Sequence, residues 1–339
     1  PVASLPERLL WPVPDFPARH IGPQMRAGAL EGTRQGADEI DLSLELMDVE
    51  ALDTGRHRAM VVVDPKDRRQ LKGFLYLSGI YSPSIERAEE SERAEESLVR
   101  FYHQLTRRLV ERRMLQGLAD KMIASTQVHV KVRDAVRLDD PQILQVPFVL
   151  LTVNTPFDFT DSEAANLGAY LTGGGFLLAD IVRFLLPNYS DAELDIPAAR
   201  SLIRASFQAV GYQEWKDWQF HRLEITHPIY HCFYDINSLP RGMRDMHFIV
   251  GEYPPRTPDY LEGIMVGEQL VGVYSMRGYA DFWAGIGREL VDWSLTNNVS
   301  NHSSLVSAEE PLVYNLGVNL VVYALTREGS LARQLIAVD

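Results

Sequence analysis

The sequence predicts an α/β fold with a mostly parallel sheet, preceded by an extended N-terminal arm. Apolar runs of strand length alternate along the chain with stretches that have helical periodicity. Two of these runs, "VPFVLLTV" and "GFLLAD", are almost continuously apolar, which is typical of strands covered on both faces. Buried strands that alternate with helices are the pattern of an α/β protein.

The composition indicates a large core and one principal domain. Of the 339 residues, 46% are apolar and 23% are charged, so the chain can bury a sizeable core. We expect residues 1–57 to form the arm, because the segment 1–40 is rich in Pro, Gly and Arg and has no sustained period. Residues 58–339 are expected to form a single domain with a charged helical insert near 84–118. No run of about 18 apolar residues occurs, so we expect no membrane span.

The charge and the cysteine content argue against several classes of site. The formal net charge is −13 and no dense basic patch occurs. Nucleic acid is therefore not an expected partner, because affinity for it rests on neutralising phosphates. The single cysteine, Cys232, allows no internal disulfide and no cysteine-based zinc site. We expect no cofactor.

The first two strands are predicted as a hairpin-like pair. The runs 58–63 and 71–77 are rich in β-forming residues and flank a polar stretch that contains Asp64 and Pro65. The second run is followed by "SGIYSPS", which we interpret as a loop at the carboxyl end of a strand.

A tandem repeat follows this pair, with ERAEES at 86–91 and again at 92–97. Two such short copies cannot build a solenoid. Charge runs usually lie on solvated faces, so we interpret the repeat as the exposed start of a helix. Apolar residues then recur at helical spacing and predict a buried helix face near 98–118.

The later elements alternate between strands and helices. Thr160 and Glu163 have the spacing of a capping box, which predicts that a helix begins there. Gly173 falls where a left-handed helix C-cap is expected. Strands are predicted at 129–133, 146–153, 175–180 and 220–225, a strand pair within 260–276 across a Gly267-Glu268 turn, and further helices near 197–210 and 308–326.

The glycines Gly173–Gly175 suit three roles: a phosphate loop, a nucleophile elbow or a structural joint. A phosphate loop has its glycines between a strand and the following helix, whereas here the order is helix, glycines, strand. An elbow has a Ser or Cys flanked by glycines directly after a strand. Asp180 occupies that position in this chain, and Ile181 follows it. We interpret the glycines as a structural joint and Asp180 as a candidate functional residue.

Three segments carry a resemblance to a known family: "PFVLLTVNTPFDFTDSEAANLGAYLTGGGFLLAD", "LEITHPIYHCFYDI" and "GIMVGEQLVGVYSMRGYADFW". Together they resemble the bacterial domain-of-unknown-function family 4159, which is assigned to the class I glutamine amidotransferase-like superfamily. They are also similar, to a smaller degree, to the trehalose-utilisation ThuA-like group. The resemblance covers roughly residues 70–327 and implies a three-layer, flavodoxin-like sandwich. It implies no particular reaction, because the family has no established one.

The chain departs from the amidotransferase pattern at the position of the nucleophile. The resemblance implies a cysteine on a tight strand-to-helix elbow with a His and a Glu nearby, whereas this chain has Asp180 there. Cys232 follows a His-Pro turn without elbow glycines, and we interpret it as a packed residue. Glutaminase chemistry of the usual kind is therefore not expected.

Polar side chains gather at the predicted carboxyl ends of the strands, where open α/β sheets bind ligands. Carboxylates, a histidine and an arginine at such an edge can form an acid–base site or an anion site. Alternatively, these residues cap the helices that follow the strands. The candidate catalytic residues are Asp180 and His227, and the candidate ligand-binding residues are Ser78, Tyr81, Asn154, Thr155, Asp158, Ser275, Arg277 and Asp281.

A metal site is a further hypothesis, because His227 and His231 are four residues apart and Asp235 follows them. Pro228 suits a first helical turn but does not establish a helix, and no HExxH motif occurs. We therefore expect no metal, with His227 capping a turn and His231 packed or hydrogen-bonded.

Aromatic residues cluster in "YQEWKDWQFHR" and "GYADFWAG". Sugar-binding sites use aromatic faces, and the likeness to ThuA-like proteins implies carbohydrate. The alternative is that these residues belong to the core or to an interface.

Two functional hypotheses remain open. The first is a non-catalytic or uncharacterised binding module of the amidotransferase-like superfamily, associated with the bacterial envelope. It binds a small polar ligand, and it contacts a protein partner or a second copy through the arm. The alternative is a hydrolase-like enzyme that acts on a small polar, sugar-like substrate through Asp180 and His227. The absence of an elbow Cys or Ser favours the first. The resemblance and the start at Pro1 lead us to expect an exported, periplasmic protein, with the cytoplasm as the alternative.

Overall fold

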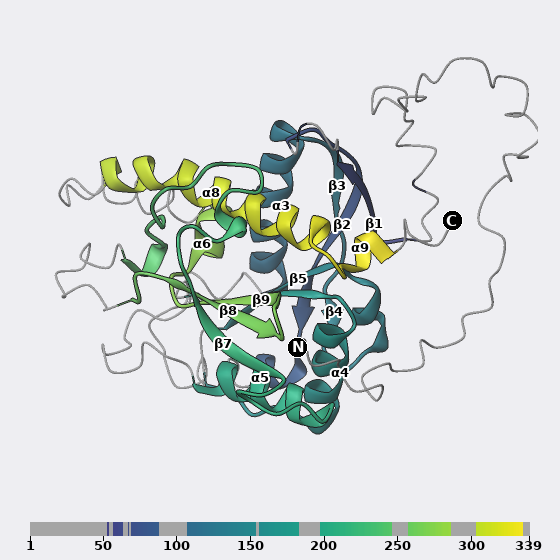
Figure 1. The fold of residues 1–339 in the computed structure, drawn as a ribbon. Helices are drawn as coiled ribbons and strands as arrows, with labels where there is room; N and C mark the ends of the chain where they lie inside the picture. The colour runs from purple at the N-terminus through teal and green to yellow at the C-terminus, as the bar shows by residue number, and fades with distance from the viewer. Residues whose placement is uncertain are drawn as a thin grey trace, which may run out of the picture. The chain divides into compact units, whose positions relative to one another are not determined.

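The computed structural model describes residues 53, 57–63, 67, 69–87, 107–153, 156–182, 197–245, 257–285 and 303–334, with backbone alone at 107–110, 303–305 and 333–334. All of these residues belong to one compact unit, Leu44–Asp339 (Figure 1). The predicted arm lies almost entirely outside the described residues, as does most of the tandem repeat. No described helix has the length and apolar character needed to cross a membrane.

The predicted hairpin is confirmed, but its second strand is longer than expected. Strand β1 (Ala59–Val63) pairs antiparallel with the first half of β2 (Leu71–Tyr81). The second half of β2 pairs parallel with β4 (Val136–Arg137) and β5 (Phe148–Val153). The prediction that "SGIY" begins a loop is therefore wrong, because these residues find ladder partners on neighbouring strands.

The central sheet is largely parallel, as predicted. Within the described residues nine strands form one sheet in the order β1-β2-β5-β6-β9-β8-β7, with β3 and β4 also pairing with β2. Neighbours from β2 to β9 are parallel, whereas β7, β8 and β9 are joined antiparallel. The strands not yet given bounds are β3 (Gln127–Val132), β6 (Phe176–Ile181), β7 (Trp218–Leu223), β8 (Leu261–Val266) and β9 (Gln269–Ser275).

Three helices lie close to the predicted positions, whereas the helix predicted near 98–118 continues to Ser125 and the short helix at Tyr279–Trp283 was not predicted. The capping box at Thr160 and Glu163 is confirmed, with both reciprocal hydrogen bonds present. The helices are α3 (Arg107–Ser125), α4 (Asp161–Thr172), α5 (Pro197–Ala209), α6 (Tyr279–Trp283), α8 (Ser303–Thr326) and α9 (Leu331–Gln334), with two 3₁₀ turns, η4 (Pro141–Gln145) and η6 (Pro228–Tyr230).

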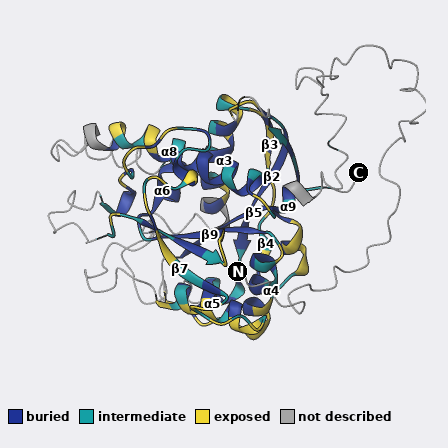
Figure 2. Ribbon diagram, in the orientation of Figure 1, coloured by how far each residue is buried: buried dark blue, intermediate teal, exposed yellow. Residues whose placement is uncertain are grey.

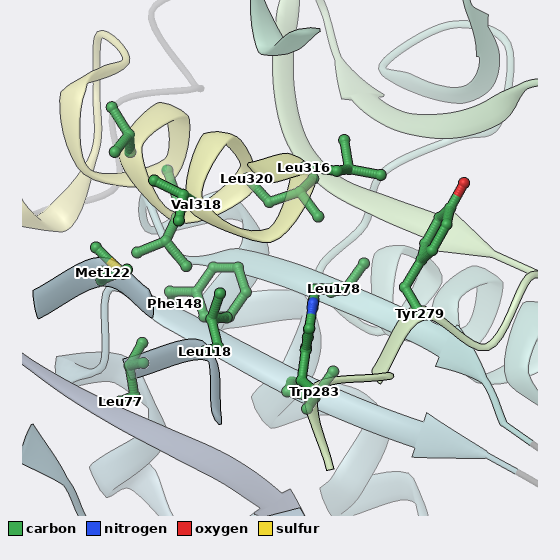
Figure 3. Close-up of a cluster of buried hydrophobic side chains, with 14 of the residues drawn as sticks. Leu77, Leu118, Met122, Phe148, Leu178, Tyr279, Trp283, Leu316, Val318 and Leu320 are labelled. Atoms are coloured by element: carbon green, nitrogen blue, oxygen red, sulfur yellow. The ribbon is translucent and has the colours of Figure 1, made fainter. Parts of the chain in front are cut away.

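Helices cover both faces of the sheet, so the central strands β5 and β6 are buried along their whole length (Figure 2). Helices α4 and α5 pack on one face, and α3, α6 and α8 pack on the other. On the face covered by α3, α6 and α8, side chains of the strands and of these three helices form one hydrophobic cluster. Figure 3 shows part of it: Leu77, Phe148, Leu178, Leu118, Met122, Tyr279, Trp283, Leu316, Val318 and Leu320.

The glycines between α4 and β6 form a structural joint, as predicted, although the left-handed residue is not the expected one. Gly173 has a φ of −86°, whereas Gly174 has a φ of +100°. A Cβ on Gly175 would lie 2.1 Å from the buried ring of Tyr170, so only glycine fits there. The guanidinium of Arg327, at the end of α8, donates to the carbonyl oxygens of Gly174 and Gly175 at 2.9 Å each. This joint lies at the amino end of β6, away from the edge where such sheets bind ligands.

Candidate functional site

A row of polar side chains crosses the carboxyl ends of three neighbouring strands. Thr152 on β5 is in register with Asp180 on β6, and Asp180 is in register with Ser275 on β9. Residues in register share a face of the sheet, here the face covered by α3, α6 and α8. All three side chains are buried, so their polar atoms need partners within the protein.

Asp180 serves the start of helix α6. Its Oδ1 accepts from the backbone N–H of Gly278 at 3.2 Å, and its Oδ2 accepts from that of Ala280 at 2.8 Å. The first N–H groups of a helix have no partner within the helix, and a carboxylate satisfies them. Sequence analysis gave capping as the alternative to catalysis at this edge, and the geometry of Asp180 is that of a cap from a neighbouring strand.

The protonation of Asp180 is balanced between opposing effects. Complete burial raises the pKa of Asp180 from 3.8 to about 6, although hydrogen bonds from Ala280, Ser275 and Gly278 and the charge of Arg244 lower it. Burial disfavours the charged form, and hydrogen bonds to the carboxylate favour it. Burial is the larger effect here.

Two buried arginines, Arg277 and Arg244, lie in this part of the structure, and only Arg277 was predicted. Arg277 donates through Nη1 to Asp245 and through Nη2 to the carbonyl of Pro258, each at 2.5 Å. Arg244 is 5% exposed, and its Nε and Nη1 atoms have no hydrogen-bond partner among the described residues. Burial lowers the pKa of Arg244, and attraction to Asp180 and other acidic groups opposes this. Sequence analysis missed Arg244 because it lies in a polar stretch, "RGMRDM", that follows no predicted strand.

Asp281 lies beside this pair. It is completely buried in α6, and a Cβ on Gly278 would lie 3.0 Å from its Oδ2 and 3.3 Å from Cγ of Arg244. The structure thus brings together four of the predicted site residues, Asp180, Ser275, Arg277 and Asp281, with Arg244 added.

The predicted site residues of the earlier strands lie apart from this group. Ser78 and Tyr81 are within β2, where Ser78 is buried and Tyr81 pairs with Arg137 of β4. Asp158 is exposed in the loop before α4. Asn154 and Thr155 lie outside the described residues.

Two glutamates, Glu111 and Glu163, bind hydroxyl groups near the carboxyl ends of these strands. The sequence predicted a role for Glu163 alone, in the capping box. Glu111 of α3 accepts from the hydroxyl of Thr152 at 2.6 Å, so it ties α3 to the polar row. Glu163 accepts from the hydroxyls of Ser82 and Ser84 at 2.6 and 2.9 Å in addition to its role in the capping box. Both carboxylates satisfy neighbouring hydroxyl groups.

His227 has a capping role of its own. Its Nδ1 accepts from the backbone N–H of Ile229 at 3.1 Å at the start of η6, and its ring lies 5.7 Å from that of Tyr323. Burial lowers the pKa of His227, which favours the neutral ring that this bond needs. No hydrogen bond or ion pair joins His227 to Asp180, although the structure describes both side chains.

The other candidate metal ligands are also engaged elsewhere. His231 contacts the carbonyl of Ile225 through Nε2 at 2.8 Å and Asp235 through Nδ1 at 3.6 Å. Asp235 in turn accepts from Arg69 at 2.7 Å. Cys232 is half-buried, and its thiol donates to the carbonyl of Asn319. No group of three or more metal-ligating side chains occurs among the described residues.

A comparison with protein families matches residues 98–325 of this chain to the model described as a domain of unknown function, DUF4159. The chain belongs to the DUF4159 family. No curated protein matches it. The match includes Asp180, His227 and Arg244, whereas Ser78 and Tyr81 on β2 precede it.

Within the DUF4159 match, a buried carboxylate lies near the carboxyl end of strand β6. Strand β6 delivers Asp180 to the carboxyl edge, and α6, more than 90 residues later in the sequence, supplies the N–H groups that it binds. The chemistry that this arrangement provides is hydrogen bonding by fixed donors and acceptors.

Proposed function

We propose that this DUF4159 protein is a non-catalytic ligand- or partner-binding module of the class I glutamine amidotransferase-like superfamily, with a three-layer, flavodoxin-like sandwich. Helices on both faces of a largely parallel sheet support that architecture. Asp180, at the position where working members carry a cysteine, supports the loss of the usual chemistry.

The observation that carries this proposal is the engagement of both oxygens of Asp180. A general base must lie within hydrogen-bond reach of the proton that it removes. Here Oδ1 and Oδ2 each accept from the backbone at the start of α6, and the side chain is completely buried. Asp180 is in this way a part of the scaffold that orders the site.

The hydrolase alternative has less support. It needs Asp180 and His227 to act on one substrate, yet each caps a different helix start. The pKa of Asp180, raised to about 6 by burial, is the one feature that favours an acid–base role, because such a group changes its protonation near neutral pH.

Arg244 supports a small polar ligand at the same edge. Unpaired N–H groups on a buried guanidinium are costly, by about 1–3 kcal/mol for each unsatisfied group, and an acceptor on a ligand removes this cost. Asp180, Asp281 and Asp245 already surround Arg244 with negative charge, so a ligand without net charge suits the site better than an anion. In our proposal the module works at the bacterial envelope, which rests on the family resemblance alone.

Two measurements, each with its own pair of variants, test the proposal. Thermal-shift screens of sugars, nucleosides and amino acids compare the unchanged protein with Arg244→Met and with the exposed-arginine control Arg69→Met. We expect a stabilising ligand whose effect is lost in Arg244→Met and kept in Arg69→Met. Turnover of glutamine or of nitrophenyl esters and glycosides that both Asp180→Asn and His227→Gln abolish, in variants that remain folded, would overturn the proposal in favour of a hydrolase.

A further inference from the structure

Strand β7 is the last strand of the sheet and pairs with β8 alone among the described strands (Figure 1). The exposed edge of an end strand presents unpaired N–H and C=O groups, which are a template for pairing with another chain. Which backbone groups of β7 point outward follows from the contacts at its start.

The even-numbered residues of β7 point away from β8. Asp217, just before the strand, accepts from Gly267 in the turn between β8 and β9, so its carbonyl faces the sheet. Trp218 instead donates to Gln213 and accepts from Trp215, both of which lie outside the sheet. Direction alternates along an antiparallel strand, so the N–H and C=O groups of Phe220 and Arg222 also point outward.

These outward groups have no partner within the described part of the chain. No hydrogen bond reaches the main chain of Phe220 or Arg222. Past the strand, the carbonyl of Glu224 is occupied by the N–H of His227. The open edge is therefore bounded on both sides and consists of two residues, Phe220 and Arg222.

This open edge is complementary to itself. When two copies pair antiparallel with His221 opposite the second copy's His221, Phe220 of each copy meets Arg222 of the other. Both are then hydrogen-bonded pairs, and all the open N–H and C=O groups are satisfied by about four hydrogen bonds. A two-fold axis produces this arrangement, and a symmetric pair closes without leaving an edge for a third copy.

Trp215 provides an independent observation at the same place. Its side chain is 76% exposed, and it is the one described non-glycine residue with a positive φ, 69°. A left-handed backbone costs about 1–2 kcal/mol for such a residue, and backbone strain of this kind is common at functional contacts. Hydrogen bonds of Asp217 with Gln213 and Gly267 fix the backbone of the loop that carries Trp215.

The exposed side of β3 shows how an edge of this sheet is protected. Strand β3 pairs with β2 alone among the described strands, and it carries exposed Lys131, bound to Asp53 at 2.8 Å. A lysine on an edge strand deters pairing with a second chain. Strand β7 carries no lysine.

We propose that two copies of this chain form a two-fold symmetric dimer by antiparallel pairing of their β7 edges, with Trp215 as an apolar anchor at each end. This dimer is independent of the ligand site at Asp180 and Arg244. It also differs from an oligomer formed through the N-terminal arm.

Sedimentation velocity of the full chain over a wide concentration range tests this dimer with two matched pairs of variants. Arg222→Pro removes the outward N–H and leaves the ladder to β8 intact, because proline is tolerated where an edge N–H faces outward. Arg222→Ala loses the same side chain but keeps the N–H. We expect the unchanged protein and Arg222→Ala to dimerise, and Arg222→Pro to raise the dissociation constant at least about tenfold.

Trp215→Asn tests whether Trp215 stabilises the dimer or the fold of the monomer. Asparagine tolerates the left-handed backbone, so the monomer keeps or gains stability in urea, whereas the dimer weakens at least about tenfold. The exposed Ile123→Asn is the control and leaves the dimer unchanged. A chain that stays monomeric at every concentration, or a dimer that neither Arg222→Pro nor Trp215→Asn weakens, would overturn the proposal.

Discussion

Charged side chains satisfy backbone groups at both ends of strand β6, with opposite sign. At the amino end, Arg327 donates to the carbonyl oxygens of Gly174 and Gly175. At the carboxyl end, Asp180 accepts from the N–H groups of Gly278 and Ala280. In each case a residue distant in sequence closes a joint between a strand and a helix.

The two ends differ in how easily their role is recognised. The order helix, glycines, strand excludes a phosphate loop, so the sequence alone predicts a structural role for the glycines at the amino end of β6. A carboxylate after a buried strand looks the same in sequence whether it is a catalyst or a cap. Only the partners of its oxygens distinguish these roles, so polar residues at a strand end are insufficient evidence for an active site.

The largest expected effect is at the amino end. Gly175→Ala places a Cβ 2.1 Å from the ring of Tyr170, whose hydroxyl is held by two hydrogen bonds to Phe176. The ring cannot move freely, so we expect a loss of about 3 kcal/mol or more in the free energy of unfolding, measured in urea. Gly211→Ala is the control, because its φ is +83° and no atom lies within 4 Å. It should cost only about 1 kcal/mol of backbone strain, and equal costs for the two variants would contradict the packing argument.

At the carboxyl end the expected effect depends on pH. The folded-state pKa of Asp180, about 6, lies above the usual 3.8. Its contribution to stability is therefore complete below about pH 3.8 and is lost as the pH rises through about 6. Relative to Asp180→Asn, the unchanged protein should lose about 3 kcal/mol of unfolding free energy across this interval. Urea titrations at several pH values measure the difference, and parallel curves for the two proteins would contradict it.

Arg327, at the amino end of β6, should contribute somewhat less to the free energy of unfolding than Gly175 or Asp180. Arg327→Gln removes the donors to Gly174 and Gly175 and leaves two backbone carbonyls with fewer partners. We expect a loss of about 2 kcal/mol in unfolding free energy, as for other hydrogen bonds to charged groups. Arg69→Gln, which breaks an exposed pair with Asp235, is the control and should change stability by less than about 1 kcal/mol. A cost for Arg327→Gln no larger than for Arg69→Gln would show that the joint does not depend on Arg327.

The smallest effect concerns a cap that the sequence alone predicts. Thr160→Ala removes the side-chain acceptor for the N–H of Glu163 at the start of α4, which should cost about 1 kcal/mol. Thr172→Ala, at the other end of the same helix, loses a hydroxyl that donates to Gly168. It should be nearly neutral in thermal or urea unfolding, and the reverse ranking would show that the capping box is dispensable.

Local patterns predict much of this fold. The hairpin, the capping box and the buried strands each depend on residues close in sequence, and the structure has them where they were predicted. Two local predictions were wrong in detail. The strand that contains Ser78 and Tyr81 continues because β4 and β5 pair with it, and Gly174 takes the positive φ expected of Gly173.

The site was less predictable, because its contacts join distant residues. Asp180 was identified as a strand-end residue, but its partners come from residues 278 and 280. Arg244 and Arg327 have no local signal, because a buried arginine is recognised by its surroundings and not by its neighbours in sequence. Sequence motifs describe residues that are close in the chain, so they do not predict contacts between residues this far apart.

The most direct test of the assignment of Asp180 is an NMR titration of the backbone amides of Gly278 and Ala280. Their N–H groups donate to the carboxylate, so their chemical shifts report its protonation. We predict that both signals move with a midpoint near pH 6 in the unchanged protein and do not move in Asp180→Asn. Amide signals that stay constant through this interval in both proteins would contradict the assignment of Asp180 as a cap that changes its protonation near pH 6.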